Sequence, residues 1–295
     1  MDSLGGHRNI VKLKGAHEDD YYVYIVMELC AGGELFNAIV KERNFSERKA
    51  AVYFRKMVEV VDYCQQLRVV HRDLKPENFL LTSPEGELKL TDFGLGMFFK
   101  PGERFRDLVG SPYYVAPEVL GFDYSHEADM WSLGVILYIL LSGLPPFWGD
   151  TNEQIFCMIR TAPLDFETEP WPHISPAAKD CVWRLLERDP SRRATSEQIL
   201  RHEWLASQGV APNVPLDSVV LRRLRHFAQM NKLKKACLMV VGQQLSPAEI
   251  LGLQAVFRSL DIDGSGAINA EELRAALGAW GRHVSEAELR AGGGG

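Results

Sequence analysis

The sequence predicts an α+β fold, with short β segments in the first third and mostly helices after it. Residues 11–13 and 21–27 are apolar, β-branched and aromatic runs separated by a polar stretch, a pattern typical of a hairpin. From Glu34 the apolar spacing becomes helical, and after Glu118 it stays mostly helical to about Leu205. A chain of 295 residues, 46% of them hydrophobic, has the composition of a globular protein of about two domains.

The elements between these landmarks carry their own boundary residues. Gly32-Gly33 ends the hairpin region, and a long helix begins after Ser46, a residue type that caps helix N-termini. Two short strands, 79–81 and 88–90, are joined by Pro84-Glu85-Gly86, which is a turn sequence. Further helices are expected to begin near Ser125, Thr151, Ser175 and Thr195.

Composition excludes several classes of protein. The net charge is −6, so no basic field argues for nucleic acid as a partner. Five cysteines lie far apart without a CxxC pair, which indicates free thiols in a reducing compartment. The longest apolar run, 131–144, is about 14 residues long, short of the roughly 18 needed to span a bilayer. We therefore expect a monomeric cytoplasmic protein without a transmembrane segment, with the nucleus or a membrane surface as alternatives.

The charge of the chain changes after residue 205. Residues 206–217 contain Gly, Asn and two prolines and are expected to form a linker. Residues 219–241 hold six Lys or Arg and no acid, whereas residues 243–290 hold seven acids and four bases, a local net charge of −3. The basic segment has the pattern of an amphipathic calmodulin-target helix, and an ordinary surface helix is the alternative. Its apolar positions are Val220, Leu221, Leu224, Phe227, Met230, Leu233 and Cys237.

A dense motif occupies residues 71–78, His-Arg-Asp-Leu-Lys-Pro-Glu-Asn. Asp92-Phe93-Gly94 follows nineteen residues after Asp73, and Ala116-Pro117-Glu118 comes next in order. This order and spacing resemble the catalytic loop, metal-binding triplet and activation-segment end of Ser/Thr protein kinases. The resemblance implies a protein kinase-like fold with a mostly helical large lobe and an incomplete small lobe. It also implies a buried structural ion pair between Glu118 and Arg193.

In a kinase these motifs position the groups of a phosphoryl transfer from ATP to a protein hydroxyl. The resemblance makes Asp73 the group that orients the substrate hydroxyl and accepts its proton, and Lys75 the cation beside the γ-phosphate. Asn78 and Asp92 supply the oxygen ligands that Mg²⁺ prefers. Ser111 matches the residue that braces Asp73 and Lys75 in Ser/Thr kinases.

The resemblance also assigns residues that contact the nucleotide and the substrate. Glu28 and Cys30 lie where backbone groups of the kinase hinge pair with adenine, and Leu80 would form the floor of that pocket. Glu34 matches a residue that contacts ribose and a basic side chain upstream of the phosphoacceptor, and Glu77 is placed similarly. Both acids imply substrates with Arg or Lys near the acceptor. The alternative is that they are ordinary solvated acids at helix starts.

The activation segment lacks an acceptor for phosphate. Residues 95–110 contain no Ser, Thr or Tyr, although Arg72, the residue that grips a phosphate there in many kinases, is present. Phosphorylation within this stretch therefore cannot order it. We hypothesise that the carboxylate of Glu103 or Asp107 supplies the anion instead.

Residues 261–272 match an EF-hand calcium loop. Its ligands would be Asp261, Asp263, Ser265, Asn269 and Glu272, with a backbone carbonyl from Ala267. Kinase, basic helix and EF-hand in this order resemble the calcium-dependent protein kinases of plants, algae and protists. The resemblance implies ATP, Mg²⁺ and Ca²⁺ as cofactors and protein substrates. It also implies a basic helix that inhibits the kinase until its own calmodulin-like domain draws it away; control by a separate calmodulin is the alternative.

The chain departs from this family at both ends. Six residues precede His7, where the match begins, so the Gly-rich loop, strand lysine and helix glutamate are expected to be absent. One EF-hand loop is present where the family usually carries four. We expect a kinase domain over 1–205, a linker and basic junction over 206–242, a partial calmodulin-like domain over 243–291 and a glycine tail over 292–295. The alternative function is a catalytically impaired fragment or isoform that acts as a calcium-responsive binding module.

Overall fold

The computed structural model describes residues 6–42, 45–206, 209–227 and 259. The chain divides into two compact units, Met1–Met230 and Asn231–Gly295, and the elements below belong to the first. The strands are β1 (Leu13–Glu18), β2 (Val23–Met27), β3 (Gly33–Glu34), β4 (Val69–Val70), β5 (Phe79–Leu81), β6 (Leu88–Leu90) and β7 (Met97–Phe98). The α-helices are α1 (Leu35–Ile39), α2 (Glu47–Gln66), α3 (Glu127–Ser142), α4 (Asn152–Thr161), α5 (Pro176–Leu185) and α6 (Ser196–Leu200). Short 3₁₀ turns lie at Pro76–Asn78, Val119–Gly121 and Trp171–His173, and a further helix covers residues 218–227.

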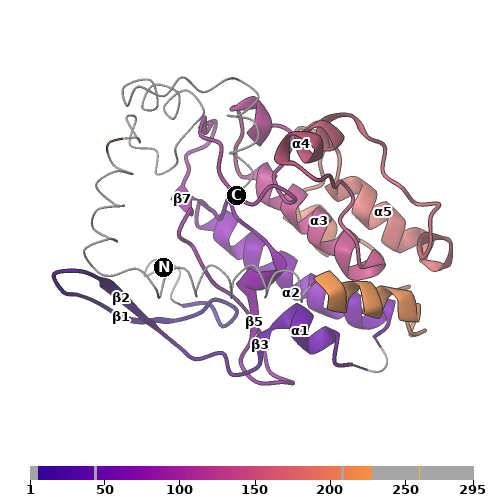
Figure 1. The fold of residues 1–295 in the computed structure, drawn as a ribbon, viewed down its shortest axis with the longest axis horizontal. Helices are drawn as coiled ribbons and strands as arrows, with labels where there is room; N and C mark the ends of the chain where they lie inside the picture. The colour runs from indigo at the N-terminus through magenta and orange to yellow at the C-terminus, as the bar shows by residue number, and fades with distance from the viewer. Residues whose placement is uncertain (1–5, 43–44, 207–208, 228–258, 260–295) are drawn as a thin grey trace. The chain divides into compact units, whose positions relative to one another are not determined.

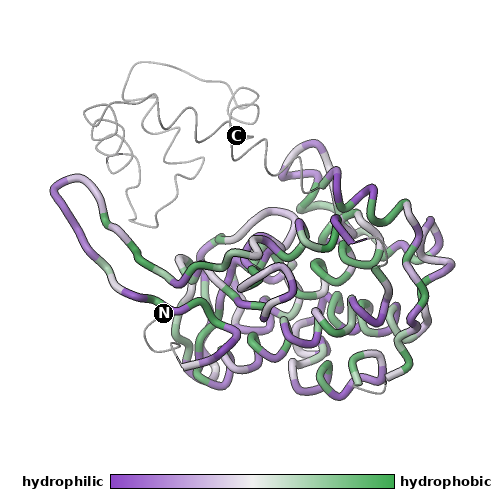
Figure 2. The backbone as a smooth tube through the Cα atoms, turned by 90° about the horizontal axis from the view of Figure 1, so that it is seen from below, coloured by the Kyte–Doolittle hydropathy of each residue, from purple (hydrophilic) through white to green (hydrophobic). Residues whose placement is uncertain are grey.

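The predicted hairpin is confirmed. Strands β1 and β2 pair antiparallel, with Glu18 opposite Val23 at the tip. The Asp19 carboxylate accepts hydrogen bonds from the backbone N–H groups of Tyr21 and Tyr22 at 2.8 and 2.7 Å, which closes the turn. The hairpin projects from the helical body of the first unit (Figure 1; Figure 2). Strands β3, β5 and β6 form a second antiparallel sheet, and β4 pairs with β7.

The predicted helix starts are confirmed at four caps. The side chains of Ser46, Thr151, Ser175 and Thr195 each accept a hydrogen bond from the backbone N–H three residues on. Thr195 completes a capping box with Gln198, because each side chain bonds the other residue's backbone N–H. Helix α3 begins at Glu127, two positions after the predicted Ser125.

Helix α3 lies at the centre of the helical body and is buried on every side. All its residues from Ala128 to Ser142 are buried, which explains why the longest apolar run of the sequence falls here. A Cβ on Gly134 would lie 2.8 Å from the side chains of Leu185 and Leu186, so glycine permits the close packing of α5 on α3. Among the described residues, no helix is long and apolar enough to cross a bilayer.

The ion pair between Glu118 and Arg193 is confirmed. The Arg193 guanidinium donates to both carboxylate oxygens of Glu118, at 2.5 and 2.9 Å, and both side chains are buried. Arg193 Nη1 also donates to the carbonyl of Glu127 at the start of α3. The pair therefore joins the end of the Ala116-Pro117-Glu118 motif to the loop before α6.

The segment expected to be a linker packs on the first unit. The backbone N–H of Arg48 donates to the Pro212 carbonyl at 3.1 Å, and the N–H of Leu216 donates to the Phe45 carbonyl at 2.8 Å. Pro215 forms a bridge with Ser46 at the start of α2. The proline content that predicted a linker is compatible with this packing, because an extended segment can accept hydrogen bonds through its carbonyls where proline lacks an N–H.

Candidate active site

The candidate catalytic loop, residues 71–78, follows β4 and is held by one buried acid on α3. Asp129 accepts hydrogen bonds from the backbone N–H groups of His71 at 2.8 Å and Arg72 at 2.9 Å. Arg72 has a left-handed backbone, with φ of 68°, and these two bonds support that strained conformation. Burial raises the pKa of Asp129. Sequence analysis did not single out Asp129. The signal that could have revealed it is an acid within the first turn of the most apolar helix.

The candidate base lies at the centre of the loop. Asp73 Oδ1 accepts from the hydroxyl of Ser111 at 2.8 Å and from its backbone N–H at 3.0 Å. Asp73 Oδ2 pairs with the ammonium group of Lys75. The contact expected between Ser111 and Asp73 is thus present, and the segment before Ala116-Pro117-Glu118 reaches back to the catalytic loop. The two hydrogen bonds from Ser111 and the ion pair with Lys75 together fix the orientation of the Asp73 carboxylate.

The two candidate magnesium ligands belong to neighbouring chain segments. Asn78 is 3% exposed, and its side-chain Nδ2 donates to the Asp73 carbonyl at 2.8 Å. The Asn78 carbonyl accepts from the backbone N–H of Thr91 at 3.0 Å, directly before Asp92. Asp92 has φ of 63°, and its Oδ1 accepts from the backbone N–H of Gly94 at 3.4 Å. Among the described residues, no three His, Cys, Asp or Glu side chains form a metal-binding group.

The hinge positions lie after β2. The Glu28 backbone N–H donates to the Lys12 carbonyl at 2.9 Å. The Glu28 carboxylate pairs with Lys89 Nζ at 2.5 Å, a buried cation on β6 that sequence analysis missed. Burial raises the pKa of the Cys30 thiol. Leu80 on β5 lies opposite Lys89 in the same sheet, so its expected place near the hinge is consistent with the strand order.

The two predicted substrate acids lie on separate elements around the loop. Glu34 occupies the N-cap position of α1 without a capping bond to the helix backbone, and its Oε2 accepts from the Asn37 side chain at 2.8 Å. Glu77 lies in the 3₁₀ turn next to Asn78. Burial, followed by the charge of Glu77, raises the pKa of Tyr114 well above its ordinary value.

The activation segment is closed by Asp107. Arg72 Nη1 donates to both carboxylate oxygens of Asp107, at 2.8 and 2.6 Å, and Arg72 Nε donates to the Leu95 carbonyl at 2.7 Å. The Tyr124 hydroxyl donates to Asp107 Oδ1 at 2.9 Å. Burial raises the pKa of Asp107, but the hydrogen bonds from Tyr124 and Arg72 outweigh it and lower that pKa below its usual value. Glu103 instead accepts locally from the Lys100 N–H. The anion predicted for this segment is therefore Asp107.

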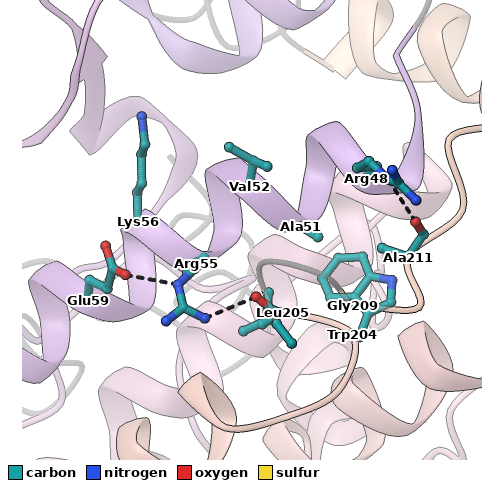
Figure 3. Close-up of a pocket in the computed structure, with 11 residues that line it drawn as sticks. Arg48, Ala51, Val52, Arg55, Lys56, Glu59, Trp204, Leu205, Gly209 and Ala211 are labelled. Carbon is teal, nitrogen blue, oxygen red and sulfur yellow. Dashed lines mark hydrogen bonds and ion pairs between the residues drawn. The ribbon is translucent and has the colours of Figure 1, made fainter.

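A cavity of about 600 Å³ lies away from these residues, between α2 and the chain that follows α6 (Figure 3). Arg55 donates to the Glu59 carboxylate and to the Leu205 carbonyl, and Arg48 donates to the Ala211 carbonyl. Arg48 thus fastens the segment of residues 209–217 to α2, and Arg55 fastens the end of the chain that follows α6. The cavity holds none of the predicted site residues.

The predicted calcium ligands lie outside the described residues. They are Asp261, Asp263, Ser265, Ala267, Asn269 and Glu272. Their role stays a prediction from the sequence.

Comparison with known proteins shows which families match this chain. The family model described as "Protein kinase domain" matches residues 1–205, and the one described as "EF-hand domain" matches residues 252–281. Calcium-dependent protein kinase 15 of Oryza sativa subsp. japonica is 56% identical over 98% of this chain and 54% of its own length. Calcium-dependent protein kinase 6 of Arabidopsis thaliana is 54% identical over 98% of this chain and 54% of its own length. The chain spans about half the length of the curated relatives it matches.

Proposed function

The chain belongs to the protein kinase family, and from that premise we propose that the protein transfers the γ-phosphate of ATP to Ser or Thr of protein substrates under the control of calcium. The observation that carries this proposal is the Asp73 carboxylate, held by Ser111 and paired with Lys75 beneath an activation segment that Arg72 and Asp107 close. Phosphoryl transfer depends on positioning and charge neutralisation, which is what these contacts supply.

The residues of the loop divide the work of the transfer. Asp73 orients the substrate hydroxyl and accepts its proton, and Ser111 keeps the carboxylate in place. Lys75 lies next to the point of transfer and stabilises the negative charge that develops on the phosphate oxygens. Its pairing with Asp73 keeps cation and base together before the substrates bind.

Asn78 and Asp92 fit a magnesium ion. Both offer hard oxygen atoms, and Mg²⁺ binds through one or two protein ligands plus substrate phosphates. The bond from Asn78 Nδ2 to the Asp73 carbonyl leaves Oδ1 as the coordinating atom of that side chain. When bound, the ion neutralises phosphate charge.

The residues after β2 are proposed to contact the nucleotide, and two acids, one of them at the start of α1, are proposed to contact the substrate. The Glu28 carbonyl and backbone groups of Cys30 pair with adenine, and Leu80 lies beneath the base. Glu34 and Glu77 favour Arg or Lys upstream of the acceptor, because a carboxylate attracts a cationic side chain. The Lys89–Glu28 pair supports this arrangement by holding the hinge to β6.

Calcium control rests on the sequence of the second unit. The EF-hand loop binds calcium, and the basic segment of residues 219–241 is the intramolecular partner of the calcium-loaded domain. We also infer a monomer in the cytoplasm. The four described cysteines, Cys30, Cys64, Cys157 and Cys181, are free thiols, which supports a reducing compartment.

The test is phosphate transfer by the protein at its native length. Radiolabelled ATP is supplied with a peptide that carries Arg three residues before Ser, and with the same peptide carrying Ala there. We expect calcium to raise the rate above that in a chelator, and the Arg peptide to be preferred. Asp73→Asn is expected to lower kcat by about 10²- to 10⁴-fold. Equal rates for wild type and Asp73→Asn would refute the assignment, and calcium binding without any transfer would favour a calcium-responsive binding module.

A further inference from the structure

The basic segment begins with a helix that belongs to the hydrophobic core of the first unit. Residues 218–227 are helical (orange in Figure 1), and the side chains of Val220 and Leu224 are both 0% exposed. Leu221 and Phe227 are partly buried against the same core. This pattern differs from that of a surface helix awaiting a partner, since its apolar stripe is already covered.

The end of α3 is shaped to receive this helix. Gly143, which terminates α3, has φ of 79°, a conformation that favours glycine. A Cβ at this position would lie 2.5 Å from Arg223 Cβ and 2.9 Å from the Val220 carbonyl oxygen. The two backbones therefore approach as closely as glycine permits, so the helix fits this place specifically.

Two arginines of the helix bind three backbone carbonyl groups, two of which lie at the C-termini of α3 and α1. Arg223 Nη1 donates to the carbonyls of Ser142 at 3.3 Å and Glu169 at 2.8 Å. Arg225 Nη2 donates to the carbonyl of Val40, the C-cap of α1, at 3.2 Å. Cations are favourable at helix C-termini, where the last carbonyls lack partners within the helix. These guanidinium groups are thus engaged within the first unit.

We infer that residues 218–227 are a fixed anchor, which stays docked on the rest of the first unit whether or not calcium is bound. The inference deepens the proposed calcium control and rests on it. Detaching the helix would expose the side chains of Val220 and Leu224 and leave carbonyls without donors. A calcium-loaded domain that bound this helix would need the same apolar side chains. Those side chains cannot be buried in the core of the first unit and against that domain at the same time. The inference therefore narrows the intramolecular partner proposed above from the whole of residues 219–241 to the part of that segment that follows the docked helix.

Hydrogen–deuterium exchange of the whole protein tests the anchor directly. Backbone exchange in peptides covering residues 218–227 is compared in calcium and in a chelator. We expect the same protection in both conditions, with calcium-dependent changes confined to peptides beyond residue 227. Faster exchange of 218–227 in calcium would overturn the inference.

Substitutions provide the second readout. Leu224→Ala is expected to lower Tm by about 4 °C or more and to leave the calcium concentration at half-activation unchanged. Arg223→Ala should lower Tm, and Arg222→Ala is the matched control, because Arg222 is an exposed cation on the same helix. A changed calcium midpoint with unchanged Tm for Leu224→Ala would overturn the inference. If calcium alters neither the exchange nor the activity of the wild type, the proposed calcium regulation is refuted. The protection of residues 218–227 and the Tm of Leu224→Ala then still decide whether the anchor exists.

Discussion

Replacing Asp107 with Asn removes the charge that Arg72 binds in the activation segment. The substitution keeps the size of the side chain and one acceptor oxygen, but it abolishes the bidentate ion pair. Arg72 has a side chain only 7% exposed, so its guanidinium would remain largely buried beside a neutral amide. The segment that also carries Ser111, the brace of Asp73, would lose order.

The expected cost follows from the exposure of the two partners. The Asp107 side chain is 42% exposed, so the ordered activation segment loses less free energy than the roughly 3 to 5 kcal/mol that breaking a fully buried ion pair costs. Losing a hydrogen bond to a charged group costs about 2 kcal/mol, which corresponds to a fall of up to about 30-fold in the ordered population. We expect kcat for a basic peptide to fall by up to that factor.

The assay is kcat at saturating ATP and calcium for the protein at its native length. Asp107→Glu retains the charge and should keep most of the activity. Glu103→Gln is the second control, because Glu103 bonds only the nearby Lys100 N–H among the contacts of the described residues. An unchanged kcat for Asp107→Asn, or a larger loss for Glu103→Gln, would refute the reasoning.

Three further predictions concern pH, the catalytic loop and calcium. The lowered pKa of Asp107 means that its stabilisation is complete above the unfolded pKa of about 3.9 and is lost as pH falls through the lower folded pKa. The profile of kcat against pH should then lack the step near pH 6 that a phosphate group would add; Asp107→Asn should leave this region unaltered. Asp129→Asn should lower the free energy of unfolding by about 1 to 3 kcal/mol in urea titrations, because one backbone N–H of the catalytic loop loses its charged acceptor; equal stability would contradict the role given to Asp129. Glu272→Gln should raise the calcium concentration needed for activity, since a bidentate ligand is lost, whereas the neighbouring Glu271→Gln should not.

Much of the site could be predicted because its residues lie within short, dense motifs. Asp73, Lys75 and Asn78 lie within six positions of one loop, so their proximity is a property of the chain itself. Helix starts were equally local, since a capping side chain bonds a backbone N–H three residues away. The burial of α3 followed from its apolar composition, because a helix that is apolar on every side and too short to cross a bilayer is expected to be covered by other elements.

Other features depended on where distant segments meet. The sequence offered Glu103 and Asp107 as equal candidates, and only the path of the chain brought Asp107 to Arg72 and Tyr124. Likewise, the docking of 209–227 and the support of the catalytic loop by Asp129 join residues more than fifty positions apart. Composition and spacing therefore determined which side chains are candidates for the chemistry. The tertiary structure alone decided which of them are paired, because a hydrogen bond or ion pair depends on separations of a few ångströms that no linear pattern specifies.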